Sequence, residues 1–286
     1  MKGLLINADD FGLREGVNTR IVEGFQAGLL ASTSLLANTP AAAAAIDLAR
    51  KHPGLAVGVH LNLSQGVPVA PRERIRSLLN RDGCFPPSAG AVLRRSLRNA
   101  IDPDEVRTEW EAQIALVADA GVRPSHLDGH HHVHLLPRLF PVAASLARRF
   151  AIPAVRVPRS IQFDRSGLAP VTRLKWWTIA HLARRHDAKN DRLDPCDAFF
   201  ELPVGLGGSA RYQAVLDEFL LRIEDGVTEL ACHPGYAGPD PNVPTPEGCD
   251  PELAALADPA WQEAIQQRGI RILHRRDLRP SSGEMP

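Results

Sequence analysis

The alternation of short apolar runs with amphipathic helical patterns constrains the fold of this chain more than any other feature. It continues along nearly the whole sequence and is typical of βαβ units around a parallel sheet. We therefore predict an α/β fold with about seven parallel strands, either closed into a barrel or open and doubly wound. The predicted strands cover residues 3–8, 30–37, 55–60, 123–128, 154–158, 199–203 and 228–233, and 270–273 is a further candidate.

The helix expected after residue 101 has the clearest start signal. Asp102 is a suitable N-cap, Pro103 suits the first helical position, and Glu105 is the expected capping-box partner. Val106 and Trp110 follow at helical spacing on one face. We expect this helix to pack on the core, with Trp110 as an anchor.

The length and the charge balance set limits on the organisation of the protein. Its 286 residues, 44% of them apolar, are enough for a large core. We expect one α/β domain over 1–279 and a tail over 280–286, although two small domains would also fit this length. Basic and acidic residues number 33 each, so the chain has no electrostatic signal for nucleic acid or an anionic membrane.

The cysteines and the apolar segments bear on the compartment. The four cysteines are widely spaced without a CxxC pair, which favours neither a zinc ribbon nor a disulfide framework and is typical of a reducing compartment. The apolar run in the opening MKGLLINADD is too short for a signal peptide, and polar residues interrupt the run at 27–45. We therefore expect no membrane span and a cytoplasmic location.

The unusual polar residues share one position, because each lies at the carboxyl end of a predicted strand. In a barrel and in an open parallel sheet alike, these ends meet where ligands bind. A carboxylate and two imidazoles suit a divalent cation such as zinc and leave a coordination position for a catalytic water. The residues concerned are Asp9, Asp10, His60, Asp128, His130 and His233.

The segment SHLDGHHHVH at 125–134 holds five of the eleven histidines and has no good structural explanation. The other polar positions do have alternatives. The Asp9 and Asp10 pair could form a turn and cap a helix starting near Arg14. His60 could be a hydrogen-bonded core histidine, and His233 could belong to a turn with Pro234. The histidine segment therefore carries most of the functional prediction.

Five motifs resemble those of the YdjC-like carbohydrate deacetylases, the family of the chitooligosaccharide deacetylases. They are INADDFGL at 6–13, STSLLAN at 32–38, VGVHLNL at 57–63, HLDGHHHVHLLP at 126–137 and CHPGY at 232–236, in the order found in the family. The resemblance implies a distorted (β/α) barrel similar to a TIM barrel and one divalent metal ion, zinc or magnesium. It also implies removal of acetyl groups from N-acetylated sugars, and a homodimer.

The resemblance also implies roles for five residues. Asp10, His60 and His130 match the positions of the family's metal ligands. Asp9 matches the general base, and His233 matches the histidine that assists the leaving amine.

Four further residues are candidates for hydrogen bonds behind the ligands or for contacts with the sugar. Partners of this kind commonly orient metal-bound imidazoles. Asp128 could serve His130 or Asp9, and the other candidates are His126, His132 and His134.

Two segments are harder to interpret. The long segment 233–251, rich in proline and glycine, has the length of a functional loop. It departs from the family at 248–250, where we expect a basic residue in relatives, and this concerns the identity of the sugar. Trp176 and Trp177 could stack on a sugar ring, or they could pack in the core or at a dimer contact.

Two other functional classes remain open on the sequence. One is a different metal-dependent hydrolase on a similar barrel, such as a phosphoesterase or a deacetylase of a glycolipid or antibiotic precursor. The absence of a dense basic loop argues against phosphate. The other class is a binder of metal or sugar without catalysis, which would have no use for Asp9 beside a metal ligand.

Overall fold

Seven parallel strands form one sheet in the computed structural model, which describes residues 1–159, 170–187, 193–235 and 250–278. The strand order is β4-β3-β2-β1-β6-β5, and β7 pairs with the start of β1. The strands are β1 (Lys2–Phe11), β2 (Ser32–Leu35), β3 (Ala56–Leu61), β4 (Leu127–Gly129), β5 (Ala198–Glu201), β6 (Gly226–Cys232) and β7 (Arg271–Ile272). The predicted parallel α/β fold is confirmed, with several strands beginning or ending at other residues than expected.

Strand β1 lies at the centre of the sheet because its apolar residues are buried on both faces. Leu4 and Leu5 are both 0% exposed. β6 pairs with β1 from Lys2 to Ala8, while the other edge of β1 is shared by β7 at its start and β2 at its end. The carboxyl end of β1 therefore lies between β2 and β6.

The sheet curls, and a few isolated hydrogen bonds span the gap between β4 and β5. Leu127 of β4 forms an isolated parallel bridge with Val155, and the Val155 N–H donates to the Leu193 carbonyl at 3.0 Å. The Val157 N–H donates to the Asp194 carboxylate at 2.5 Å. These contacts make the sheet a distorted half-barrel.

The prediction of a full strand over 154–158 is wrong. Only Val155 forms a bridge to a neighbouring strand. Pro158 has no N–H to donate to a strand ladder, and the N–H of Val157 donates to the side chain of Asp194. Side-chain hydrogen bonding thus replaces strand pairing at this edge.

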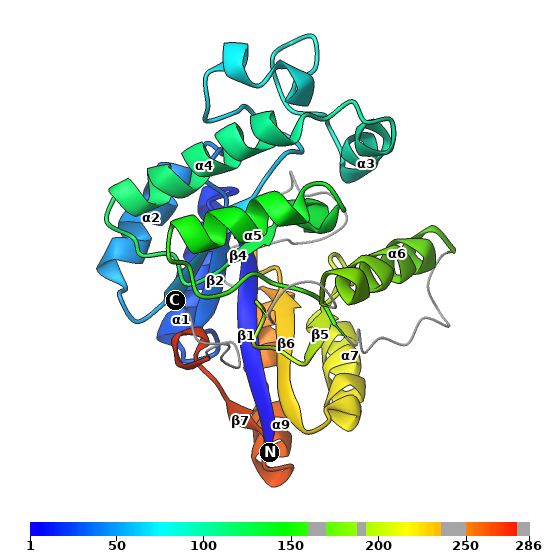
Figure 1. The fold of residues 1–286 in the computed structure, drawn as a ribbon. Helices are drawn as coiled ribbons and strands as arrows, with labels where there is room; N and C mark the ends of the chain where they lie inside the picture. Colours follow the sequence, from blue (N-terminus) through cyan, green and yellow to red (C-terminus); the bar gives the residue numbers. More distant parts are fainter. Residues whose placement is uncertain (160–169, 188–192, 236–249, 279–286) are drawn as a thin grey trace.

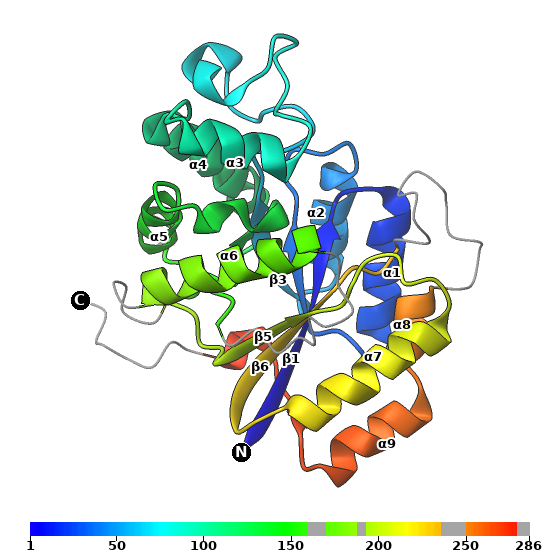
Figure 2. The same ribbon diagram turned by 90° about the vertical axis from the view of Figure 1, so that its right-hand side faces the viewer.

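Helices lie around the outside of the sheet in both views (Figures 1 and 2). They are α1 (Glu15–Gln26), α2 (Ala42–Lys51), α3 (Ala89–Leu97), α4 (Pro103–Asp119), α5 (Phe140–Arg149), α6 (Pro170–Asp187), α7 (Ser209–Arg222), α8 (Pro251–Leu256) and α9 (Pro259–Gln267). Short 3₁₀ turns are η1 (Arg72–Arg74), η2 (Arg76–Leu78), η3 (His130–Leu135) and η4 (Arg275–Asp277).

The start of α4 differs from the expected capping box. Asp102 caps the helix by accepting from the Asp104 N–H at 2.9 Å, and Trp110 is buried as predicted. Glu105 accepts from the Ser77 N–H at 2.6 Å, and the Ser77 hydroxyl accepts from the Asp102 N–H at 2.9 Å. A tertiary contact with η2 therefore replaces the local bond, because Ser77 supplies both partners.

Residues 64–72 run across α4 and are held there by a buried carboxylate. Glu109 of α4 accepts from the N–H groups of Val69 and Ala70 at 3.0 and 2.8 Å. In Figure 1 this segment, in cyan, lies at the top with α4, on the side where β1 ends. Residues 64–72 therefore have a defined position near the carboxyl ends of the strands, and Arg72 begins η1.

Two expectations from composition concern cysteines and membranes. Cys84, Cys196 and Cys232 are free thiols, as expected, and Cys249 lies outside the described residues. Among the described residues, no helix combines the length and the apolar character that a membrane span requires. The predicted tail at 280–286 also lies outside the described residues.

Candidate active site

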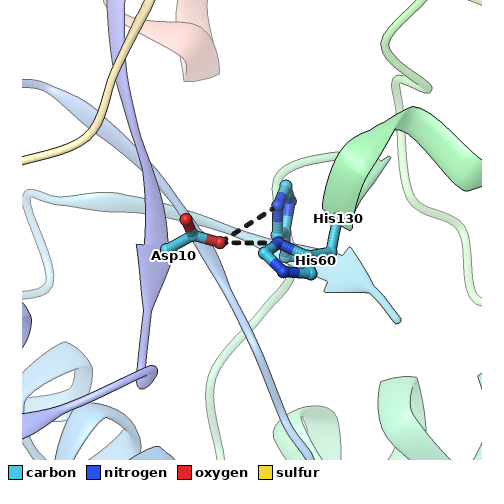
Figure 3. A group of neighbouring side chains, drawn as sticks. All are labelled: Asp10, His60 and His130. Carbon is cyan, nitrogen blue, oxygen red and sulfur yellow. Dashed lines mark ion pairs between the residues drawn. The ribbon is translucent and has the colours of Figure 1, made fainter. Parts of the chain in front are cut away.

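Asp10, His60 and His130 converge at the carboxyl end of the sheet. One oxygen or nitrogen from each lies within 4.8 Å of the other two. Asp10 Oδ1 is 2.9 Å from His130 Nδ1 and 3.4 Å from His60 Nε2 (Figure 3). All three side chains are buried. Burial opposes ionisation of Asp10, but His130 and His60 hold the pKa of its carboxyl well below the usual range.

Asp9 and Asp10 lie within the last residues of β1. They were expected directly after a strand ending at residue 8. Asp10 has a positive φ of 68°, and the register between β1 and β2 shifts between Ala8 and Phe11. This left-handed residue interrupts the regular alternation of side chains along the strand. The alternative of a helix cap is excluded, because α1 follows Arg14 without a side-chain cap.

His60 is oriented by a carboxylate on the neighbouring strand. His60 and Asp128 are direct partners in the β3–β4 register, and His60 Nδ1 is 2.7 Å from Asp128 Oδ1. Burial alone would lower the pKa of His60, but the Asp128 carboxylate raises it to about 9. Asp128 was expected to serve His130 or Asp9, and its imidazole partner is His60 instead. Nδ1 is thus engaged, and Nε2 faces Asp10.

The three consecutive histidines point to three different parts of the chain. His130 faces Asp10, His131 Nδ1 lies 3.0 Å from the Ser64 hydroxyl, and His132 Nε2 lies 2.8 Å from Glu201 Oε2. His131 and His132 have positive φ values of 55° and 57°, which are uncommon outside glycine. The rings of His130 and His131 still pack together, with centroids 3.9 Å apart, but their nitrogens face different partners, and His132 reaches β5 across the gap in the sheet.

Asp9 faces a different environment from Asp10. Arg156 Nη1 and Nη2 lie 2.7 and 2.8 Å from the two oxygens of Asp9, and the Asn7 amide donates to Asp9 Oδ1 at 2.7 Å. Burial would raise the pKa of Asp9, but the Arg156 guanidinium lowers it. Asp9 is therefore a carboxylate anion beside the predicted ligands.

Arg156 belongs to a buried chain of charges below the histidines. It contacts Asp128 Oδ2 at 2.9 Å and Glu229 Oε1 at 2.8 Å, and Arg275 Nη1 lies 3.1 Å from Glu229 Oε2. All four residues are at most 2% exposed. Sequence reasoning missed Arg156, Glu229 and Arg275. The first two carried a signal, because each is the only charged residue within a short apolar run, AVRVP or VTELAC.

His126 and His134 are fully buried, and their rings form hydrogen bonds inside the protein. His126 contacts the hydroxyls of Ser34 and Ser125 at 3.1 and 2.9 Å, and His134 Nε2 donates to the Arg156 carbonyl at 2.9 Å. Both rings are 0% exposed. Glycines make room for them, because a Cβ at position 58 would lie 2.4 Å from the ring of His126. Of the two roles considered for these residues, the contacts in the structure correspond to hydrogen bonds inside the protein.

His233 follows β6, directly beyond the pairing of Cys232 with Ala8. It lies near enough to be among the groups that lower the pKa of Asp10. Its backbone N–H donates to Glu252 Oε1 at 3.1 Å. The turn that was the alternative interpretation is present at Pro234 and Gly235, and it adjoins the site.

The remaining predictions fall partly outside the described residues. These exclude 236–249, hence most of the expected loop at 233–251, and the side chain of Trp176. Trp177 is 54% exposed and stacks on the ring of His181, with centroids 5.5 Å apart. This exposure excludes core packing for Trp177.

Together these observations define an α/β protein with a buried carboxylate and imidazole cluster at the carboxyl ends of its strands. The sequence model of the family described as YdjC-like protein matches residues 3–267. The chain belongs to this family.

Curated relatives cover nearly the full chain. A carbohydrate deacetylase of Geobacillus stearothermophilus is 35% identical over 96% of this chain and 97% of its own. A chitooligosaccharide deacetylase of Serratia marcescens is 30% identical over 97% and 98%. A crystal structure from Enterococcus faecalis, described as a cellobiose-phosphate cleavage protein, has a TM-score of 0.72 and 29% identity, covering 97% of this chain and 99% of that one.

Proposed function

We propose that this protein is a metal-dependent hydrolase that removes the acetyl group from an N-acetylated sugar, such as a chitooligosaccharide. The convergence of Asp10, His60 and His130, with a second carboxylate beside them, is the observation that carries the proposal. The names of the relatives support the same reaction and substrate class.

The three converging residues fit a divalent cation by their donor chemistry. One carboxylate oxygen and two imidazole nitrogens suit zinc, while magnesium prefers oxygen ligands. Asp128 on the far nitrogen of His60 is the kind of partner that orients a metal-bound imidazole. When bound, the ion would supply Lewis-acid activation of the attacking water and of the acetyl carbonyl.

Asp9 is suited to accept the proton of the attacking water. Its carboxylate is held by both terminal nitrogens of Arg156, so it remains ionised and keeps one orientation. Water oxygen bonds to the acetyl carbon, the carbon–nitrogen bond breaks, and acetate and a free amine result. Asp9 takes one proton, and His233, from the neighbouring strand β6, gives a proton to the leaving nitrogen.

Acetate release from N,N′-diacetylchitobiose tests the proposal. The protein is assayed after chelation and again after zinc, magnesium, cobalt or nickel is restored one at a time. We expect acetate only with metal, and release at least about 100-fold slower from the Asp9→Asn variant, which keeps its metal. A folded, metal-loaded protein that releases no acetate with any ion contradicts the proposal.

The same protein preparations, given a phosphorylated disaccharide, separate a deacetylase from a phosphoesterase. The structural relative described as a cellobiose-phosphate cleavage protein makes phosphorylated disaccharides the second substrate class to test. Release of inorganic phosphate without acetate would favour a phosphoesterase on the same cluster.

A further inference from the structure

Two carboxylates at the start of α8 hold the backbone next to His233. The His233 N–H donates to Glu252 Oε1 at 3.1 Å, and the Gly235 N–H donates to Asp250 Oδ2 at 2.5 Å. The other oxygen of Asp250 accepts from the N–H groups of Glu252 and Leu253, each at 3.0 Å. The helix start and the His233 turn are therefore joined by one set of hydrogen bonds.

These carboxylates are costly to bury. Asp250 is 6% exposed and Glu252 is 2% exposed, and no ion pair of either is found among the described residues. Burial raises the pKa of Glu252 well above its usual range. Burying a carboxyl group without a cation costs stability. Such a group therefore points to a purpose other than stability. The contact with the His233 backbone supplies such a purpose.

The turn after His233 has little freedom to adjust. Cys232 is held in the sheet by its pairing with Ala8. Gly235 has a positive φ of 92°, and a Cβ there would lie 2.7 Å from the Cα of Val17. His233 is thus fixed on one side by β6 and on the other by the two carboxylates.

We propose that Glu252, assisted by Asp250, is a positioning residue that sets the place of His233 for proton transfer. This inference rests on the proposed function for its catalytic consequence, but the positioning itself is a structural statement. The bonds also tie together the two ends of the connection between Gly235 and Asp250.

A double-mutant cycle with His233→Ala tests the catalytic consequence in the zinc-loaded full chain. Glu252→Ala should lower kcat for N,N′-diacetylchitobiose roughly 10-fold with little change in KM, because only proton transfer suffers. In the His233→Ala background the same change should have no further effect. Glu252→Gln keeps an oxygen acceptor and should retain kcat within about 3-fold.

Nuclear magnetic resonance of histidine-labelled protein tests the positioning without an activity readout. Glu252→Ala should shift the ring signals of His233 and speed exchange of its amide hydrogen. The matched control is Asp258→Ala, because Asp258 caps α9 before a proline as Asp250 caps α8, and it accepts from the Ala260 N–H instead. The control should leave the His233 signals unchanged.

The outcomes separate the two proposals. Unchanged His233 signals in Glu252→Ala, or an equal loss of kcat in both backgrounds, overturn the positioning role. Shifted His233 signals with a fully active His233→Ala protein keep the positioning role and remove His233 from the proposed function. If Glu252→Ala does not fold, Glu252→Asp withdraws the acceptor by one methylene and gives the same comparison.

Discussion

Asp9 and Asp10 are neighbours in sequence, yet their carboxylates face partners of different chemistry. Asp10 meets the imidazoles of His60 and His130, whereas Asp9 meets the guanidinium of Arg156. An imidazole can exchange its proton for a divalent cation, but a guanidinium stays protonated and cannot ligate. The histidine side is therefore the place for a metal, and the arginine side keeps a carboxylate available as a base.

Removing a histidine from the metal side should have the largest effect. We expect His130→Ala to lose at least about 100-fold in zinc affinity, because a direct ligand exceeds the effect of outer partners. Metal content after dialysis, measured by mass spectrometry, checks this. His131→Ala is the control for lost ring packing, since the His131 ring lies 3.9 Å from that of His130 while its Nδ1 faces Ser64, and this variant should keep its metal. Stoichiometric zinc in His130→Ala would mean that a neighbouring histidine is the ligand.

Changing the carboxylate on the arginine side should separate chemistry from binding. Asp9→Asn should keep zinc at wild-type stoichiometry and lower turnover roughly 10²- to 10⁴-fold, the usual contribution of a general base. Acetate release and metal content are measured on the same preparation. Full activity would show that Asp9 is not the base.

Removing the positive charge of Arg156 should lower the stability of the fold. Arg156→Met leaves Asp9, Asp128 and Glu229 without their shared partner, and breaking such buried pairs costs about 3–5 kcal/mol. Urea denaturation gives the loss in free energy of unfolding. The control Arg149→Met breaks an exposed pair with Glu111 and should cost less than about 1 kcal/mol. Equal losses would mean that the buried network does not stabilise the fold.

The pH dependence of stability gives the smallest effect when it is counted per pH unit. Burial lowers the pKa of His134 from 6.5 to about 3, so the unfolded chain binds more protons between these values. Stability present above pH 6.5 should be lost as the pH falls, by about 1.4 kcal/mol per pH unit from this group. His134→Gln should have a shallower acid slope in urea titrations, while exposed His274→Gln should not. Identical slopes would remove His134 from the acid response.

The site was predictable where its residues end strands that the apolar pattern marks. Asp10, His60 and His130 each follow or close such a run, and parallel strands bring their carboxyl ends together. Arg156 stands out locally as the only charged residue of AVRVP, but its partner Asp9 lies 147 residues away, so the local sequence does not show which group it faces. The strand expected at 154–158 failed for a related reason, since Asp194 supplies a bond that strand pairing would have made.

The sequence by itself determined the parallel α/β class, and it placed the candidate site residues at the ends of predicted strands. Periodicity and strand-end position are local properties, and local pattern is enough to read them. Only the tertiary structure decided which partner each residue faces. The turn at 130–132 gives three neighbouring histidines different partners, and the fold pairs Asp9 with Arg156. These choices depend on side chains that meet only after the sheet has curled, because charge and hydrogen-bond partners are satisfied across the fold rather than along the chain.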